Sequence, residues 1–190
     1  MAIAGILIGN NIVRLKAGIA AATEAWRALE PLGLALGTET LTGLAARSGD
    51  TRPILAGTIG SVACTVQIVS DFVQYAHTKV TATPPSGADV SVGVHPNPAG
   101  LFGKIRGWLG QDIIIGDPDF DDAFLITGKP ASAAANLLTP ALRERIVALA
   151  ASSLAGFVYE RDEVVVLLTG IVTDPVVLGA AIELACDVAR

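Results

Sequence analysis

Four aspartates in one short segment are the residues of this sequence best suited to chemistry. Asp117, Asp119 and Asp121 occupy alternate positions and Asp122 follows directly, within QDIIIGDPDFDDAFLITG at residues 111–128. Alternating carboxylates are typical of the first half of a calcium loop, because a hard cation takes oxygen ligands. These four residues are therefore the candidate metal ligands. Two of their carboxyl groups beside a cleft could also act as the acid and base of a hydrolase.

The second half of a calcium loop is missing from this segment. The sixth position of the loop needs glycine for the turn, and here it is Asp122. The twelfth position normally supplies a bidentate glutamate, and here it is Gly128. The pattern therefore counts against an EF-hand and leaves another oxygen-liganded metal site as an alternative.

A structural role explains the same residues. Asp117 can cap a short helical turn that starts at Pro118, with Asp119 near the positive end of that turn. Phe120 and Phe124 are four residues apart, so they would face the core together. We therefore expect the aspartates to shape a turn and to keep one side of an apolar segment in water.

Other signatures of catalysis are missing from the sequence. His77 and His95 are its only histidines, and Cys64 and Cys186 are surrounded by apolar residues, as expected of buried free thiols. No GxSxG, GxxxxGK[ST], GxGxxG, HExxH or paired Cys/His zinc spacing occurs. The sequence therefore predicts no cofactor and lacks the usual motifs of acyl transfer, P-loop hydrolysis, dinucleotide binding and zinc proteolysis.

The charge of the chain bears on its partners. There are 13 Lys and Arg residues against 18 Asp and Glu residues, which gives a net charge of −5. The tightest basic clusters, Arg143/Arg145 and Lys104/Arg106, are interpreted as solvated helix faces. A phosphate backbone is bound by a basic stripe, so we do not expect nucleic acid as a partner. The same reasoning counts against peripheral binding to an anionic membrane.

The composition is unusually apolar, with 52% hydrophobic and 16% charged residues, against a usual charged share of about 25%. The apolar run at residues 2–9 is too short to span a bilayer, and no basic residue precedes it as a signal peptide requires. The longer uncharged run at 53–70 alternates as strands do. The sequence therefore predicts no membrane span and a cytoplasmic location.

Hydrophobic periodicity and turn residues place the secondary structure. Proline and glycine end the first helix and interrupt the strands, and Thr139-Pro140 and Asp174-Pro175 are helix starts. Residues 31–52 are interpreted as a loop with a short helix at 41–47. Helices are predicted at 10–30, 99–109, 131–138, 140–151 and 175–188, and strands at 54–59, 62–69, 75–83, 89–95, 112–115, 123–127, 157–160 and 163–169.

The strands come in runs and do not alternate singly with helices. This order predicts an α+β fold in which an antiparallel sheet, a meander plus hairpins, packs against several helices. We expect one domain over residues 1–190. A division into two similar lobes, 10–110 and 111–190, stays open because helix, loop and hairpin follow one another in both halves.

Three stretches near the aspartates resemble a domain that recurs in uncharacterised bacterial proteins: DIIIGDPDFDDAFLITG, LLTPALRERIVAL and YERDEVVVLLTG. The upstream stretches AWRALEPLGL and LAGTIGS resemble the other half of that domain, so the resemblance covers most of residues 20–190. Members of the group often carry membrane-spanning segments ahead of the domain, where this chain has the short run at 2–9. The resemblance implies no activity and no catalytic residues, and its most specific motif is GDPDFDDAF.

Taken together, these features predict a non-enzymatic protein that associates with itself or with another protein. The low charge, with five acids gathered in one segment, leaves other faces poorly charged, and large apolar patches usually mark interaction sites. The alternative is a metal-binding protein or a hydrolase that uses Asp117, Asp119, Asp121 and Asp122.

Overall fold

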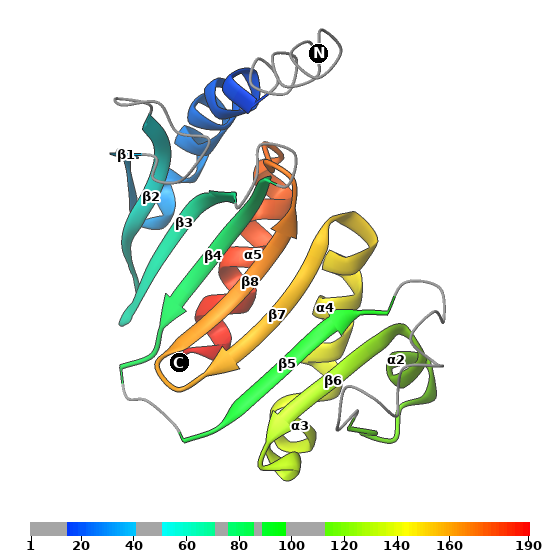
Figure 1. The fold of residues 1–190 in the computed structure, drawn as a ribbon. Helices are drawn as coiled ribbons and strands as arrows, with labels where there is room; N and C mark the ends of the chain where they lie inside the picture. Colours follow the sequence, from blue (N-terminus) through cyan, green and yellow to red (C-terminus); the bar gives the residue numbers. More distant parts are fainter. Residues whose placement is uncertain (1–14, 41–50, 71–75, 86–88, 98–112) are drawn as a thin grey trace, which may run out of the picture.

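The computed structural model describes residues 15–40, 51–70, 76–85, 89–97 and 113–190, which contain one eight-stranded sheet (Figure 1). Every pair of neighbouring strands is antiparallel, and their order is β1-β2-β3-β4-β8-β7-β5-β6. The α+β class and the antiparallel sheet predicted from the sequence are confirmed. The strands are β1 (Leu34–Thr40), β2 (Thr51–Ile59), β3 (Val62–Ser70), β4 (Ala76–Thr83), β5 (Ser91–Pro96), β6 (Phe124–Lys129), β7 (Leu154–Glu160) and β8 (Glu163–Thr169).

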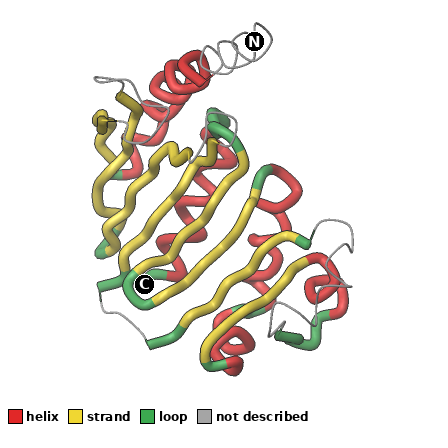
Figure 2. The backbone as a smooth tube through the Cα atoms, in the orientation of Figure 1, coloured by secondary structure: helices red, strands yellow, loops and turns green. Residues whose placement is uncertain are grey.

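The described helices cover one face of this sheet (Figures 1 and 2). Helix α5 (Pro175–Val188) contacts β3, β4 and β8, α4 (Pro140–Ser152) contacts β7, and α3 (Ala131–Leu137) contacts β5 and β6. The short helices α2 and η1 pack against β6 and β1 near the two edges of the sheet. Residues 15–26 are helical and lead into η1 (Arg27–Leu32); the others are α2 (Pro118–Ala123), α3 (Ala131–Leu137), α4 (Pro140–Ser152) and α5 (Pro175–Val188).

Two predicted hairpins are confirmed. β2 and β3 turn at Gly60, whose φ of 65° suits glycine, and β7 and β8 turn at Arg161 and Asp162. The predicted meander is wrong in its last strand, because β5 does not pair with β4. The edge of β4 is occupied by β8, the strand with buried Val164, Val166 and Leu168, and β5 lies between β7 and β6. The division into two lobes stays a prediction.

Two other local predictions are wrong. Residues 34–40 were expected in a loop but form β1, which pairs along its whole length with β2. Glycine and threonine in this segment suggested a turn, yet Leu34 and Leu36 alternate toward the helices as in any edge strand. Residues 113–115 are not a strand, although Ile113 N–H donates to the Ile126 carbonyl at 2.9 Å. The helices predicted at 41–47 and 99–109 lie outside the described residues.

The end of the first helix also differs from the prediction. Pro31 lies inside η1, and the chain turns two residues later at Gly33. Gly33 has a φ of 94°, and its N–H donates to the Glu30 carbonyl at 3.0 Å. A Cβ atom here would lie 3.0 Å from the Thr58 carbonyl oxygen, so both backbone conformation and space favour glycine.

The core lies between the sheet and the helices, and it is fastened by two buried polar side chains. Trp26 is 1% exposed, and its indole Nε1 donates to the Val172 carbonyl at 2.9 Å. Thr78 Oγ1 accepts from Val172 N–H at 2.9 Å and donates to the Gly170 carbonyl at 3.0 Å. The link between β8 and α5 is thereby fixed to the first helix and to β4.

Candidate functional site

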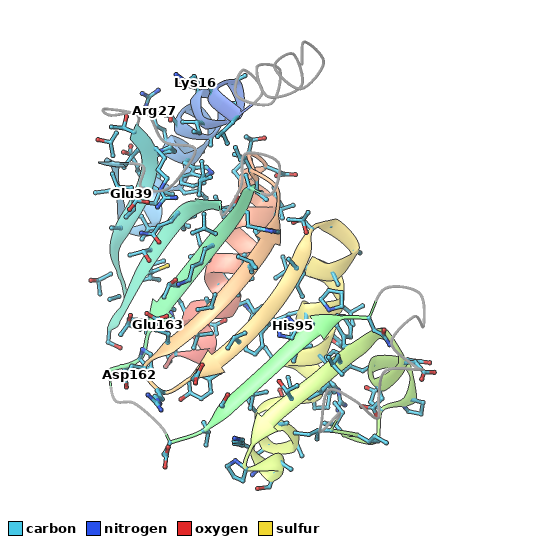
Figure 3. The ribbon with its side chains drawn as sticks, in the orientation of Figure 1. Lys16, Arg27, Glu39, His95, Asp162 and Glu163 are labelled. Carbon is cyan, nitrogen blue, oxygen red and sulfur yellow. The ribbon has the colours of Figure 1, made fainter. Side chains whose placement is uncertain are left out.

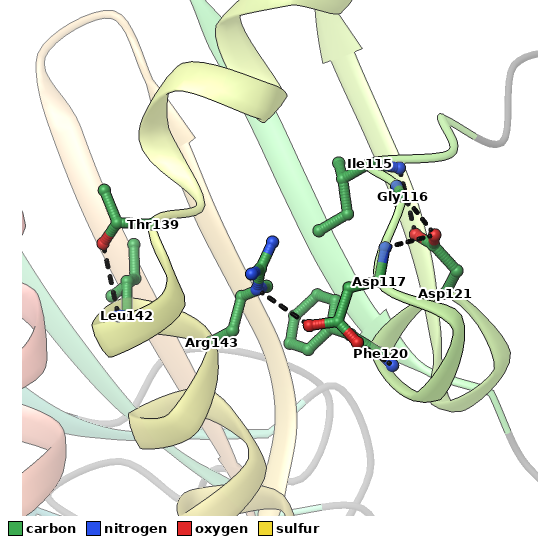
Figure 4. Close-up of polar contacts among 8 residues, drawn as sticks. All are labelled: Ile115, Gly116, Asp117, Phe120, Asp121, Thr139, Leu142 and Arg143. Atoms are coloured by element: carbon green, nitrogen blue, oxygen red, sulfur yellow. Dashed lines mark hydrogen bonds and ion pairs between the residues drawn. The ribbon is translucent and has the colours of Figure 1, made fainter.

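Asp117 caps α2, as its sequence context predicts. Its Oδ1 accepts from Phe120 N–H at 3.3 Å, and Pro118 occupies the start of the helix (Figure 4). Its Oδ2 lies 3.1 Å from Nε of Arg143 on α4. The rings of Phe120 and Phe124 are stacked with centroids 4.6 Å apart and are buried. Asp117 therefore fastens α2 to its own turn and to the neighbouring helix.

Asp121 binds the turn that precedes α2. Its carboxylate accepts hydrogen bonds from the N–H groups of Ile115, Gly116 and Asp117, each at 3.1 Å (Figure 4). Gly116 has a φ of 84°, which helps successive N–H groups to point the same way. Such a nest of backbone donors is an anion-binding concavity. Here the chain's own carboxylate occupies it.

Asp119 and Asp122 complete the motif and are exposed. Among the residues that the structure describes, no three His, Cys, Asp or Glu side chains converge as metal ligands would. The site predicted at Asp117, Asp119, Asp121 and Asp122 stays a prediction, in which Asp117 and Asp121 would have to exchange protein donors for the cation.

A thermal melt distinguishes the structural role of the aspartates from metal binding. We expect Ca²⁺, Mg²⁺ or Mn²⁺ to change the melting temperature by less than about 1 °C relative to EDTA. Saturating a real site to 100 times its Kd adds about 2.7 kcal/mol, which in a chain of this size raises the melting temperature by about 5–10 °C. A rise of that size, lost on replacement of Asp119 with asparagine, would establish the metal site.

Two hollows on the described surface are large enough to hold a small substrate. One, of about 600 Å³, lies at the ends of β5, β6 and β7, with Lys129 and Arg161 facing Asp89 and Glu160. The other, of about 410 Å³, lies between η1 and α5 and is largely apolar. Neither is lined by any of the four aspartates or by a histidine. The hydrolase alternative therefore gains no support from them.

One face of the sheet is not covered by any described helix (Figure 3). We call it the uncovered face. Side chains alternate along each strand, so every second residue points away from the helices. The strand register aligns one such residue from each of seven strands into a row, which we call the central row. It consists of Ala56, Thr65, Thr81, Val165, Val158, Gly93 and Thr127.

The residues of the central row are uncharged and have short side chains or none. Its side chains are small or β-branched, and Thr81 at its middle is only 8% exposed. A Cβ atom at Gly93 would lie 2.7 Å from Thr127 Oγ1, and one at Gly156 would lie 2.8 Å from His95 Nδ1. His95 and Thr127 therefore lie over glycine backbone, and the glycines keep this part of the face flat.

Charged residues border the central row. On one side lie Glu160 and Glu163, which are opposite each other in the register of β7 and β8. On the other side lies Lys79, whose Nζ reaches Glu163 Oε2 at 3.8 Å. Near the β1 edge, Arg52 Nε and Glu39 Oε1 form an ion pair at 2.6 Å. Because Lys79 and Glu163 lie on opposite sides of the row, their ion pair crosses its middle, and the rest of the row is uncharged between charged sides.

Sequence reasoning did not find this surface. The alternation in β3 showed that Ala63, Thr65 and Gln67 share a face, but that signal is confined to one strand. The row depends on which strands are neighbours and in which register, and β4 and β8 are separated by about eighty residues of chain. The available signal was the absence of charge on both faces of several predicted strands.

The two cysteines are buried and free, as predicted. Cys64 lies on β3 and Cys186 on α5, and both are 1% exposed. A hydrogen bond that the Cys64 thiol donates to the Cys186 sulfur, together with burial, raises the pKa of Cys64 well above its usual range, and the same hydrogen bond lowers the pKa of Cys186. Cys64 is thus held as a thiol, and because both side chains are buried, this pair contributes packing to the core.

Within the described ranges, no helix is both long and apolar enough to cross a bilayer. Arg143 and Arg145, one of the two basic clusters, contact the carboxylates of Asp117 and Asp187. Lys104 and Arg106 lie outside the described residues. The cytoplasmic location stays a prediction.

The fold belongs to a class in which one antiparallel sheet has helices on a single face. No protein-family model and no curated protein matches the sequence. A solved structure with a similar fold is that of the mycobacterial trehalose monomycolate transport factor A, TtfA. The two are 12% identical, with a TM-score of 0.56 over 91% of this chain and 95% of that one. This similarity shows the fold alone, and membership in the bacterial group sharing the GDPDFDDAF motif stays a prediction.

Proposed function

We propose that this chain is a non-enzymatic protein that acts by binding another protein surface through the uncovered face. The observation that carries the proposal is the central row, seven uncharged residues in register across seven strands. In a monomer, a sheet face is normally covered by another element or carries charged residues throughout, because large apolar patches promote association.

The dimensions of the uncovered face suit a protein partner. Eight strands spaced about 4.8 Å apart and about 20 Å long have a footprint of about 700 Å². A stable interface buries about 800 Å² on each partner. Its usual anatomy is a centre depleted of charge with a polar rim, and the central row has no charged residue of its own, with charged residues on both sides.

The comparison with known structures adds a secondary argument. The protein of similar fold is named a transport factor. We propose by analogy that the present chain is an accessory protein whose role is association and not catalysis.

Site-specific photo-crosslinking tests the proposed surface in the cell of origin. A photoreactive phenylalanine analogue replaces Leu167, which is half-buried on the uncovered face beside Gly156. The matched control places the same analogue at Val147 on α4, which is 48% exposed on the helical side. We expect one discrete protein adduct from position 167 and none from position 147.

The pattern of adducts decides the proposal. An adduct that forms at 167, and is lost when Val165 is also replaced with glutamate, supports the uncovered face as the binding surface. Equal labelling at 167 and 147, or no adduct at 167, would overturn it.

A further inference from the structure

We propose that the partner on the uncovered face is a second copy of this chain, so that two sheets stack into a symmetric dimer. This inference rests on the proposed function and names its occupant.

The uncovered face is electrically balanced although the chain is not. Its strand positions carry three acids and three bases, a net charge of zero, whereas the whole chain carries −5. Two copies therefore meet without net repulsion at this face and repel one another elsewhere. The charged strand residues are Glu39, Glu160, Glu163, Arg52, Lys79 and Lys129.

The border charges are self-complementary. A homodimer interface has the same patch on both copies, related by a two-fold axis. An axis along the central row exchanges its two sides, so the side with Glu160 and Glu163 lies over the side with Lys79. Since β4 and β8 are neighbours, Lys79 of one copy then lies beside Glu163 of the other. The rotation brings opposite charges together across the interface.

Away from the Lys79–Glu163 ion pair, the central row can be approached closely by a second sheet. Stacked sheets lie about 10 Å apart and need side chains that interdigitate without long projections. Thr65, Thr81, Val158 and Val165 are short and β-branched, and Gly93 adds no side chain at all. At the middle of the row, Val165 meets the central row of the partner.

Light scattering coupled to size-exclusion chromatography tests the dimer with the purified full chain. We expect a mass near twice 19.4 kDa for the wild type at about 50 μM, a concentration well above the Kd of typical stable interfaces. Val165→Glu places two carboxylates at the centre and is expected to weaken dimerisation at least 100-fold. Val147→Glu, on the helical side, is the matched control and is expected to stay dimeric.

A charge exchange keeps the test independent of folding defects. Lys79→Glu alone is expected to weaken the dimer about tenfold, because it places like charges across the interface. Adding Glu163→Lys in the same chain restores opposite charges both within the copy and across the interface, so dimerisation should recover. Because the double variant also restores the ion pair within the copy, thermal melts of the single and double variants are compared with the wild type, and the dimer is supported only if Lys79→Glu weakens dimerisation without lowering the melting temperature.

The outcomes separate this inference from the proposed function. A monomeric wild type at about 50 μM, or a dimer unaffected by both Val165→Glu and Lys79→Glu, overturns the second copy as partner. If the crosslink at position 167 then joins a different protein, the uncovered face remains a binding surface. If the purified chain is monomeric and position 167 gives no adduct, both are wrong.

Discussion

Replacement of Trp26 with alanine is expected to lower the free energy of unfolding by about 3–5 kcal/mol. Trp26 is 1% exposed, and its indole donates the hydrogen bond that satisfies the Val172 carbonyl. Alanine removes the largest fully buried side chain and leaves a cavity as well as an unpaired carbonyl. The loss should also release the first helix from the link between β8 and α5.

Urea unfolding followed by circular dichroism measures this effect. Trp26→Phe retains most of the ring volume and should cost about 1–3 kcal/mol, chiefly for the unpaired carbonyl of Val172. Val147→Ala, at a position 48% exposed, is the surface control and should change the free energy of unfolding by less than about 0.5 kcal/mol. If Trp26→Ala behaved like the control, the hydrogen bond to Val172 and the burial of the indole would not describe the protein in solution.

Trp26 also shows how far the sequence alone could predict this fold. Its place in a helical apolar stripe was enough to predict burial, and the alternation of Val62, Cys64, Val66 and Ile68 was enough to predict a half-buried strand. These are local patterns, because each depends on residues within one element. The capping of helices by Asp117, Thr139 and Asp174 before proline is local for the same reason, and all three caps are present.

The predictions that failed concern relations between distant segments. The β7–β8 hairpin lies between β4 and β5. Which strand pairs with the free edge of β4 is not predicted by the hydrophobic periodicity within each strand. Residues 34–40 form a strand because β2 pairs with them along their whole length. Their own glycine and threonine residues suggest a loop. Trp26 donates to the Val172 carbonyl and Thr78 accepts from Val172 N–H, across 146 and 94 residues of sequence, so neither hydrogen bond has a local signal.

The role of the aspartates combines both kinds of information. The cap at Asp117 follows from its neighbours, whereas the ion pair with Arg143 requires α4 to fold beside α2. The three donors to Asp121 are close in sequence, yet they converge because Gly116 adopts a positive φ. The spacing of the carboxylates therefore suggests a metal-binding loop. In the structure, the backbone N–H groups of this turn bind the carboxylate of Asp121.

Replacement of Asp121 with asparagine is expected to lower the free energy of unfolding by about 2–3 kcal/mol. The amide has nearly the same shape, but it removes the charge that three backbone N–H groups share at 3.1 Å. In addition, its NH₂ group must face at least one of those donors, because an amide has a single acceptor oxygen. Asp119→Asn is the matched control at an exposed position of the same helix and should change stability by less than about 0.5 kcal/mol.

The same unfolding measurement, repeated with EDTA and with Mn²⁺, separates the two roles of Asp121. If the carboxylate fills the backbone nest, the difference between wild type and Asp121→Asn is the same in both buffers. If it ligates a cation, the wild type gains stability in Mn²⁺ and the variant does not, because only a native-state ligand shifts the equilibrium. A difference confined to Mn²⁺ would therefore overturn the structural role, whereas equal differences show that the chain itself supplies the donors this anion needs.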